Sequence, residues 1–100
     1  MTERYILDAN GRPQPCDDLM TWARWMEDGN RVLRKTEIGG VRVSTVFLGL
    51  DHSFGEGPPV LWETMIFGGE HDQYQDHYAS EAAAIQGHEY ACGLVAAPSN

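Results

Sequence analysis

The second half of this sequence lacks basic residues. From Val43 to Asn100 it contains no lysine or arginine and eight acidic residues, whereas the first 42 positions hold seven basic and seven acidic residues. The formal net charge of −8 therefore arises entirely after Arg42. Proteins bind nucleic acid by neutralising phosphates with lysine and arginine. The absence of both residues therefore excludes direct nucleic-acid binding of that kind by this half of the chain. Strong acidity instead suits solubility, a basic partner, or mimicry of nucleic acid.

Cysteines and long apolar segments are also scarce. Cys16 and Cys92 lie far apart and share no spacing typical of a metal or redox site, so we expect two reduced thiols. No apolar run approaches the ~20 residues that span a bilayer. The N-terminus lacks the basic and apolar regions of a secretion signal. We therefore expect no membrane partner and a cytoplasmic location.

The motifs of common enzyme classes are missing as well. The sequence contains no P-loop, no G-x-G-x-x-G, no G-x-S-x-G, no H-E-x-x-H and no C-x-x-C. We therefore favour a binding protein over an enzyme. We expect it to use no cofactor and to form a small homo-oligomer.

Apolar periodicity and turn residues predict one α+β domain over residues 1–97, with a frayed tail at 98–100. The predicted order is β-α-β-β-β-α, with strands at 4–8, 32–38, 41–50 and 60–67 and a second helix from about 80 to 95. These strands form an antiparallel three- to four-stranded meander that includes the last three, and both helices pack on one of its faces. The polar stretch 70–79 is predicted to be a loop.

Individual residues predict where the helices and the hairpin begin and end. Gly39 and Gly40 accept the positive φ angles of a tight hairpin, which pairs Ile38 with Val41 and Thr36 with Val43. Ser80 is the expected N-cap of the second helix. The first helix is predicted to begin after a carboxylate N-cap, either Asp17 or Asp18, and to end at a left-handed glycine, Gly29. Its buried apolar face is predicted to comprise Leu19, Trp22, Trp25 and Met26.

The third meander strand contains an acid, Glu63, among apolar residues. If Leu50 pairs with Val60, Glu63 lies opposite Phe47, shares a face with Thr45 and reaches Arg34 diagonally. An exposed face with a cross-strand ion pair is the simpler interpretation, and a binding groove on the open side of the sheet is the alternative.

Spacings of three and four predict a buried stripe of side chains along the second helix. The stripe comprises Ile85, His88, Cys92 and Val95. A lone histidine there is more often a hydrogen-bonded core residue than a catalyst. Gly87 and Gly93 weaken this helix by about 1 kcal/mol each, unless close packing against the sheet requires them.

Two segments of the predicted meander resemble a known group of proteins. These are GVRVSTVFLGLDH at residues 40–52 and, after Pro58 and Pro59, ETMIFG at residues 63–68, with further similarity at 22–25 and 81–88. The chain resembles a group of small, largely uncharacterised bacteriophage and prophage proteins. The resemblance implies a phage accessory protein that acts in the host cytoplasm. From the resemblance we expect a protein that counters or modulates a host defence system by capturing a host protein or a small signalling or nucleotide ligand.

The loop 51–59 is longer than a hairpin requires, and long loops on rigid scaffolds often hold function. Asp51 either caps the turn through its own backbone or contacts a ligand, and the adjacent His52 points to the other side. With the open sheet face, this loop forms the predicted ligand- or partner-binding surface, which comprises Arg34, Arg42, Ser44, Thr45, Asp51, His52 and Glu63.

The histidines and acids near residue 75 suggest a second kind of site. His71, Asp72 and His77 are candidate ligands for one divalent metal, although their spacing matches no known site. A metal-assisted hydrolase built on them is therefore an alternative function. An acidic mimic of nucleic acid is the other alternative.

Overall fold

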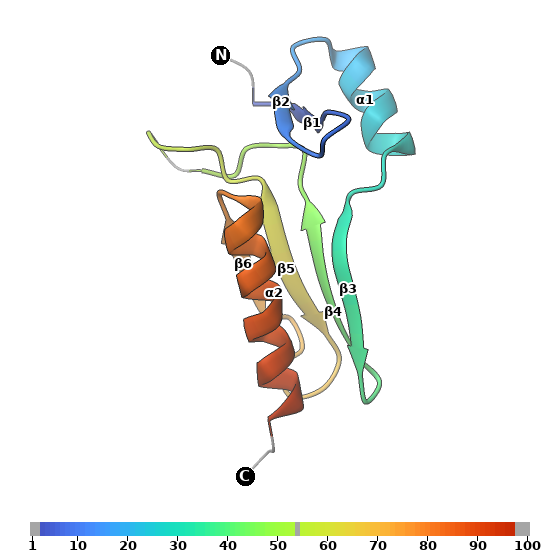
Figure 1. The fold of residues 1–100 in the computed structure, drawn as a ribbon, viewed down its shortest axis with the longest axis vertical. Helices are drawn as coiled ribbons and strands as arrows, with labels where there is room; N and C mark the ends of the chain where they lie inside the picture. Colours follow the sequence, from blue (N-terminus) through green and yellow to red (C-terminus); the bar gives the residue numbers. More distant parts are fainter. Residues whose placement is uncertain (1–2, 54, 98–100) are drawn as a thin grey trace.

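A computed structural model describes residues 3–53 and 55–97 of the chain, so the predicted tail at 98–100 lies outside the described residues. The α+β fold is confirmed (Figure 1). Four strands form one antiparallel sheet in the order β3-β4-β5-β6, and β1 and β2 form a separate two-stranded sheet. The elements are β1 (Tyr5–Leu7), β2 (Pro13–Pro15), α1 (Leu19–Asp28), β3 (Val32–Ile38), β4 (Val41–Phe47), β5 (Trp62–Phe67), β6 (Gln75–Tyr78) and α2 (Glu81–Ala96).

The β3–β4 hairpin forms as the sequence predicts. Gly39 and Gly40 have φ angles of 55° and 84°, which the turn requires and which side chains disfavour. Ile38 pairs with Val41, and the pairing continues without interruption as far as Arg34. A bulge between Val32 and Arg34 shifts the register at the start of β3.

The predicted register between β4 and β5 is wrong by one residue. Glu63 lies opposite Val46 rather than Phe47, and Thr64 lies opposite Thr45. A shift of one residue moves every side chain of a strand to the other face of its sheet. Glu63 therefore lies on the face opposite Thr45, away from Arg34.

Core packing explains this register. Val43 lies opposite Ile66 and Phe47 opposite Trp62, and all four side chains are buried. The predicted pairing would instead have placed the carboxylate of Glu63 against Phe47. Burying an unpaired carboxylate is far more costly than any turn constraint that a nine-residue loop imposes.

The stretch 70–79, predicted to be a loop, contains strand β6. Its residues Gln75 to Tyr78 pair with Trp62 to Met65 of β5. The sequence hides this strand because most of its residues are polar and exposed. The chain reverses before β6 at Gln73, a non-glycine residue with a φ of 75°.

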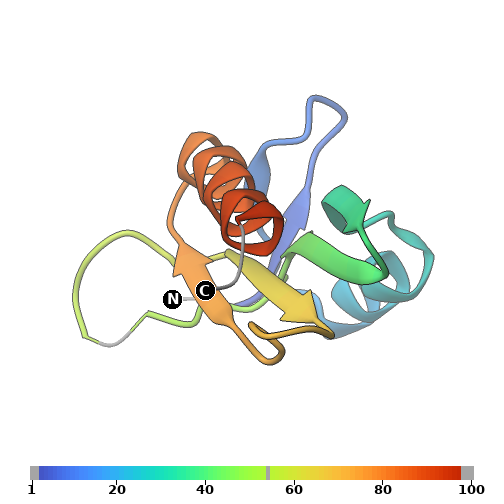
Figure 2. The same cartoon turned by 90° about the horizontal axis from the view of Figure 1, so that it is seen from below.

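Helix α2 covers one face of the four-stranded sheet (Figure 2). Ser80 caps it as predicted, accepting a hydrogen bond from the Ala83 amide at 3.1 Å. Of the predicted buried stripe, His88 is buried, whereas Ile85, Cys92 and Val95 are only partly buried, the last two packing against the core. Ala84 and Ala91 are the other buried residues of this helix, so small side chains bring it close to the sheet.

Helix α1 lies beyond the end of the sheet and does not lie beside α2 (Figure 1). It reaches the α2 side of the sheet through Trp25, whose ring packs edge-on against Phe47 at 5.6 Å between centroids. Asp18 is the N-cap, but its carboxylate accepts from the Thr21 hydroxyl and not from an amide of the first turn.

Two further predictions for α1 are wrong. Gly29 is extended, with a φ of −74°, and not left-handed. Leu19 is 56% exposed, because α1 packs through Trp22 and Trp25 at its middle while its first turn projects beyond the β1–β2 sheet. No helix of the described residues is long and apolar enough to cross a membrane.

Candidate functional site

The face of the sheet opposite α2, here called the open face, carries a carboxylate at the centre of a polar cluster. Glu63 Oε2 accepts a hydrogen bond from Gln75 Nε2 at 2.8 Å and lies 2.9 Å from His77 Nε2. Both partner residues come from β6, beside β5. The residues of the open face are Val32, Lys35, Glu37, Arg42, Ser44, Val46, Glu63, Met65, Phe67, Gln75 and His77.

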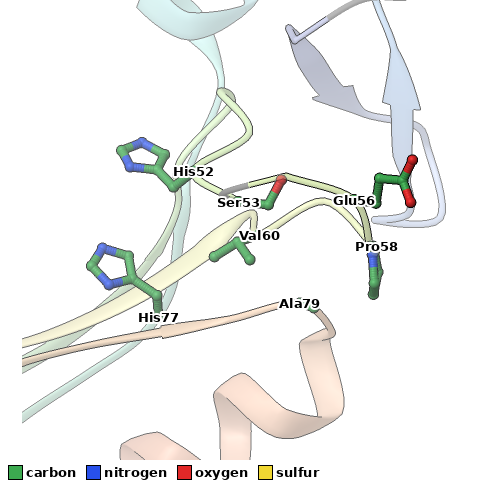
Figure 3. Close-up of a pocket in the computed structure, with 8 residues that line it drawn as sticks. His52, Ser53, Glu56, Pro58, Val60, His77 and Ala79 are labelled. Atoms are coloured by element: carbon green, nitrogen blue, oxygen red, sulfur yellow. The ribbon is translucent and has the colours of Figure 1, made fainter.

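A second histidine joins this cluster from the loop after β4. The imidazole of His52 stacks on that of His77, with 5.7 Å between ring centroids and 20° between planes. Both rings project at one end of a pocket, and Glu56 and Pro58 lie at the other (Figure 3). The cavity measures about 540 Å³ and is lined by His52, Ser53, Glu56, Gly57, Pro58, Val60, His77 and Ala79.

Asp51 holds the base of the loop that forms this pocket. Its Oδ1 accepts from the amides of Ser53 at 2.8 Å and Val60 at 2.9 Å, which confirms that it caps the turn through the backbone. Burial alone would raise the pKa of the Asp51 carboxyl, but the hydrogen bonds from Ser53 and Val60 outweigh it and lower that pKa. Asp51 therefore fixes where His52 leaves the sheet.

Replacing Asp51 with alanine is expected to lower the free energy of unfolding by about 1–2 kcal/mol at pH 7, because two amides lose a charged acceptor. The lowered pKa means that this contribution is complete above the ordinary carboxyl pKa and disappears as the pH falls through the folded-state pKa. Urea unfolding at pH 7 and pH 3 measures both effects. Glu70→Ala, at an exposed turn residue, is the control and should change stability by less than about 0.5 kcal/mol. A loss for Asp51→Ala that is equally large at pH 3 would contradict this account.

Two predicted site residues lie on the wrong side of the sheet. Thr45 is fully buried beneath α2, and Arg34 belongs to the same face because it pairs with Thr45. The sequence predicted Arg34 and Thr45 on the same face as Glu63. That prediction is wrong because the β4–β5 register differs by one residue from the predicted one. Neither residue joins the pocket.

Arg42 and Ser44 do lie on the open face, as predicted, but away from the pocket. Arg42 is opposite Phe67 at the end of the sheet near the Gly39–Gly40 turn, and its guanidinium stacks on that ring at 4.7 Å. The open face therefore carries Arg42 beside Glu37 at one end and the Glu63–His77 cluster at the other.

His88 belongs to a buried polar network and not to the pocket. Its Nδ1 is 2.7 Å from the Thr45 hydroxyl and its Nε2 is 2.9 Å from the Thr36 hydroxyl, and Thr45 in turn bonds to Thr64. Burial lowers the pKa of His88, and the nearby Arg34 lowers it further. These partners indicate a structural role for a neutral imidazole.

The three candidate metal ligands do not come together. His71 lies in the turn between β5 and β6, near Val41 and Leu94, whereas His77 lies at the opposite end of β6. Asp72 accepts from the Gly68 amide at 2.7 Å and so closes that turn. Within residues 3–53 and 55–97, no group of three or more histidine, cysteine, aspartate or glutamate side chains is arranged to hold a metal ion.

Comparison of the chain with protein-family models, with curated proteins and with solved structures finds no match. The candidate site therefore depends on its own geometry. Sequence reasoning identified His52 and Glu63 but missed Gln75, and it assigned His77 to a different site. Placing both residues beside Glu63 requires the strand β6, whose polar sequence carries no alternating apolar pattern.

Proposed function

We propose that this protein is a binding module that captures a basic segment of a partner protein in the pocket between His52, Glu56 and His77. The observation that carries the proposal is the charge of this end of the molecule. Glu56 lines the pocket, Glu63 lies directly behind His77, and the sequence contains no lysine or arginine after Arg42. No lysine or arginine lines the pocket, so a cationic side chain entering it would meet the Glu56 carboxylate.

The two histidines suit a guanidinium group better than an ammonium group. Arginine is planar, weakly hydrated and stacks on flat rings, and it also bonds to carboxylates in a defined orientation. Glu63 fixes the ring of His77 through Nε2, and the ring of His52 stacks on it. An arginine stacked on these rings would lie close to the Glu63 carboxylate, and Glu56 at the other end of the pocket would meet a neighbouring cation of the same basic segment.

The size of the pocket fits a peptide side chain with its neighbours. Ligand pockets commonly enclose about 300–1,000 Å³, and this cavity of about 540 Å³ falls within that range. Together with the phage-like segments of β4 and β5, this supports a host protein as the partner. Modulation of a host defence system is the biological role that we propose for the capture.

A charge-matched peptide pair tests the proposal. We expect a tetra-arginine peptide to bind at 0.15 M salt and a tetra-glutamate peptide not to bind, as measured by isothermal titration calorimetry. Glu56→Gln and His77→Ala should each weaken binding by about fivefold or more, the value of one ion pair near a surface. Glu70→Gln removes the same charge at the far end of the sheet and should change the affinity less than twofold. Equal losses in all three variants would mean diffuse charge attraction and would overturn the proposed site.

A further inference from the structure

No described helix or strand covers the open face of the four-stranded sheet, and the loop after β4 contacts one corner of it through His52 and His77. Figure 2 shows α2 along one side of the sheet and no helix or strand along the other. Val32 and Phe67 on this face are 46% and 36% exposed. Met65 and Val46 lie between them, partly exposed. An antiparallel sheet can leave one face to solvent, but solvated faces usually alternate to polar residues, and this one keeps four apolar side chains.

Glu63 is the most buried charge on this face, because Lys35, Glu37 and Arg42 are exposed. Its side chain is only 15% exposed, and its two partners, Gln75 and His77, carry no permanent positive charge. Both partners contact Oε2, so within the described part of the chain no residue donates a hydrogen bond to Oε1. A largely buried carboxylate in this position is suited to a cation that approaches from outside the sheet.

Arg42 is the matching charge at the other end of the same face. It is exposed, and its guanidinium lies over the Phe67 ring, 4.7 Å from the ring centroid. Arg42 pairs with Phe67, Ser44 with Met65, and Val46 with Glu63. The Ser44–Met65 pair thus lies midway between Arg42 and Glu63 along the strands.

We propose that a second copy of this chain covers the open face, turned end for end about a two-fold axis that passes over Ser44 and Met65. Stacked sheets lie about 10 Å apart with their strands within about 30° of each other. In that arrangement the Arg42–Phe67 pair of one copy lies over the Val46–Glu63 pair of the other. Arg42 then has only to cross the ~4.8 Å between neighbouring strands to reach Oε1 of Glu63.

The pattern favours a second copy over an unrelated partner because the two central strands of the face, β4 and β5, are complementary to themselves. Lys35, which lies under the axis, and Glu37 belong to the edge strand β3 and are exposed, so both side chains can turn towards solvent. A two-fold interface makes every contact twice, so one cation and one acid at equal distances from the axis give two ion pairs. The same rotation places Phe67 beside Val46 and Met65 beside Met65 at the centre. The face spans only four short strands, and small interfaces are typically weak and transient, so we expect dissociation in the micromolar range.

Charge reversal with mixing tests the dimer. Sedimentation equilibrium of the wild type between about 5 and 500 µM should show a monomer–dimer equilibrium. Arg42→Glu and Glu63→Arg should each weaken self-association by about 30-fold or more, because each creates two like-charge contacts. An equimolar mixture of the two variants should form heterodimers with nearly wild-type affinity, since both ion pairs are restored with reversed sign.

Two controls separate this interface from general charge effects. Arg24→Glu on α1 and Glu70→Arg in the β5–β6 turn make the same charge changes away from the open face and should leave the dimer unchanged. Amide NMR spectra of each variant check its fold. If Glu63→Arg does not fold, Arg42→Glu decides alone, because its side chain is on the surface. A monomeric wild type, wild-type dimerisation of Arg42→Glu, or a mixture of folded variants that fails to associate would each overturn the proposal.

Discussion

Replacing His88 with alanine is expected to lower the free energy of unfolding by about 3 kcal/mol or more, the largest loss that we predict for a polar side chain. His88 is 3% exposed and bonds to the hydroxyls of Thr36 and Thr45 through its two ring nitrogens. Its removal leaves a cavity beneath α2 and an unpaired hydroxyl in the core, and both effects destabilise.

The protonation of His88 gives this prediction a pH dependence of known sign. Burial lowers the pKa of His88, Arg34 lowers it further, and Glu89 raises it by less. The unfolded chain therefore binds a proton at higher pH than the folded chain does. The stability that the neutral imidazole provides is complete above about pH 6.5, its unfolded-state pKa, and decreases as the pH falls towards the folded-state pKa.

Urea unfolding of the wild type and of His88→Gln between pH 7.5 and 4.5 measures this effect. Glutamine retains hydrogen-bonding groups but does not titrate, so the difference between the two proteins isolates His88 from His52, His71 and His77. We expect the advantage of the wild type to shrink below pH 6.5. An advantage that stays constant across this range would show that His88 does not change its protonation between the folded and unfolded states.

The same glycine-to-alanine change is expected to have opposite signs at two positions of α2. At Gly87 an added Cβ would overlap the ring and hydroxyl of Tyr78, which packs across the helix from β6. At Gly93 an added Cβ meets nothing within 4 Å. We expect Gly87→Ala to destabilise the fold by about 1–3 kcal/mol through overpacking. Gly93→Ala should stabilise it by about 0.5–1 kcal/mol through helix propensity.

Thermal and urea unfolding of both variants provide the comparison, and Gly93→Ala is the matched control because it shares the helix and the substitution. The double variant Gly87→Ala/Tyr78→Val should recover part of the loss, since the smaller side chain vacates the space. Equal stabilisation by both single variants would mean that Tyr78 does not pack against Gly87.

The sequence was sufficient to predict the fold where two independent signals coincide. At Gly39–Gly40 the alternation of two strands and the turn chemistry indicate the same hairpin. The β4–β5 register failed because it was counted from Leu50 and Val60 across a long loop. The chain leaves the ladder earlier, at Gly49 with a φ of 76°. Pairing Val43 with Ile66 by burial would have given the observed register.

The candidate site was only partly predictable for a related reason. His52 and Glu63 were identified from the loop and from an acid in an apolar strand. The neighbours that give them chemical meaning, Gln75 and His77, reach them only through β6, whose residues are mostly polar. Periodicity cannot identify such a strand, because its pairing partner β5 determines its position and its own side chains contribute little to the core.

The four histidines offer the most direct test of the central claim that a basic segment binds beside His52 and His77. They occupy three separate environments: His52 and His77 in the pocket, His71 in the β5–β6 turn, and His88 beneath α2. Imidazole proton–carbon NMR spectra recorded at pH 7 during titration with tetra-arginine report on all four at once. The account predicts saturable shifts of the His52 and His77 signals, with those of His71 and His88 unchanged. Shifts at His71 as large as those at His77, or none at His52 and His77, would contradict it.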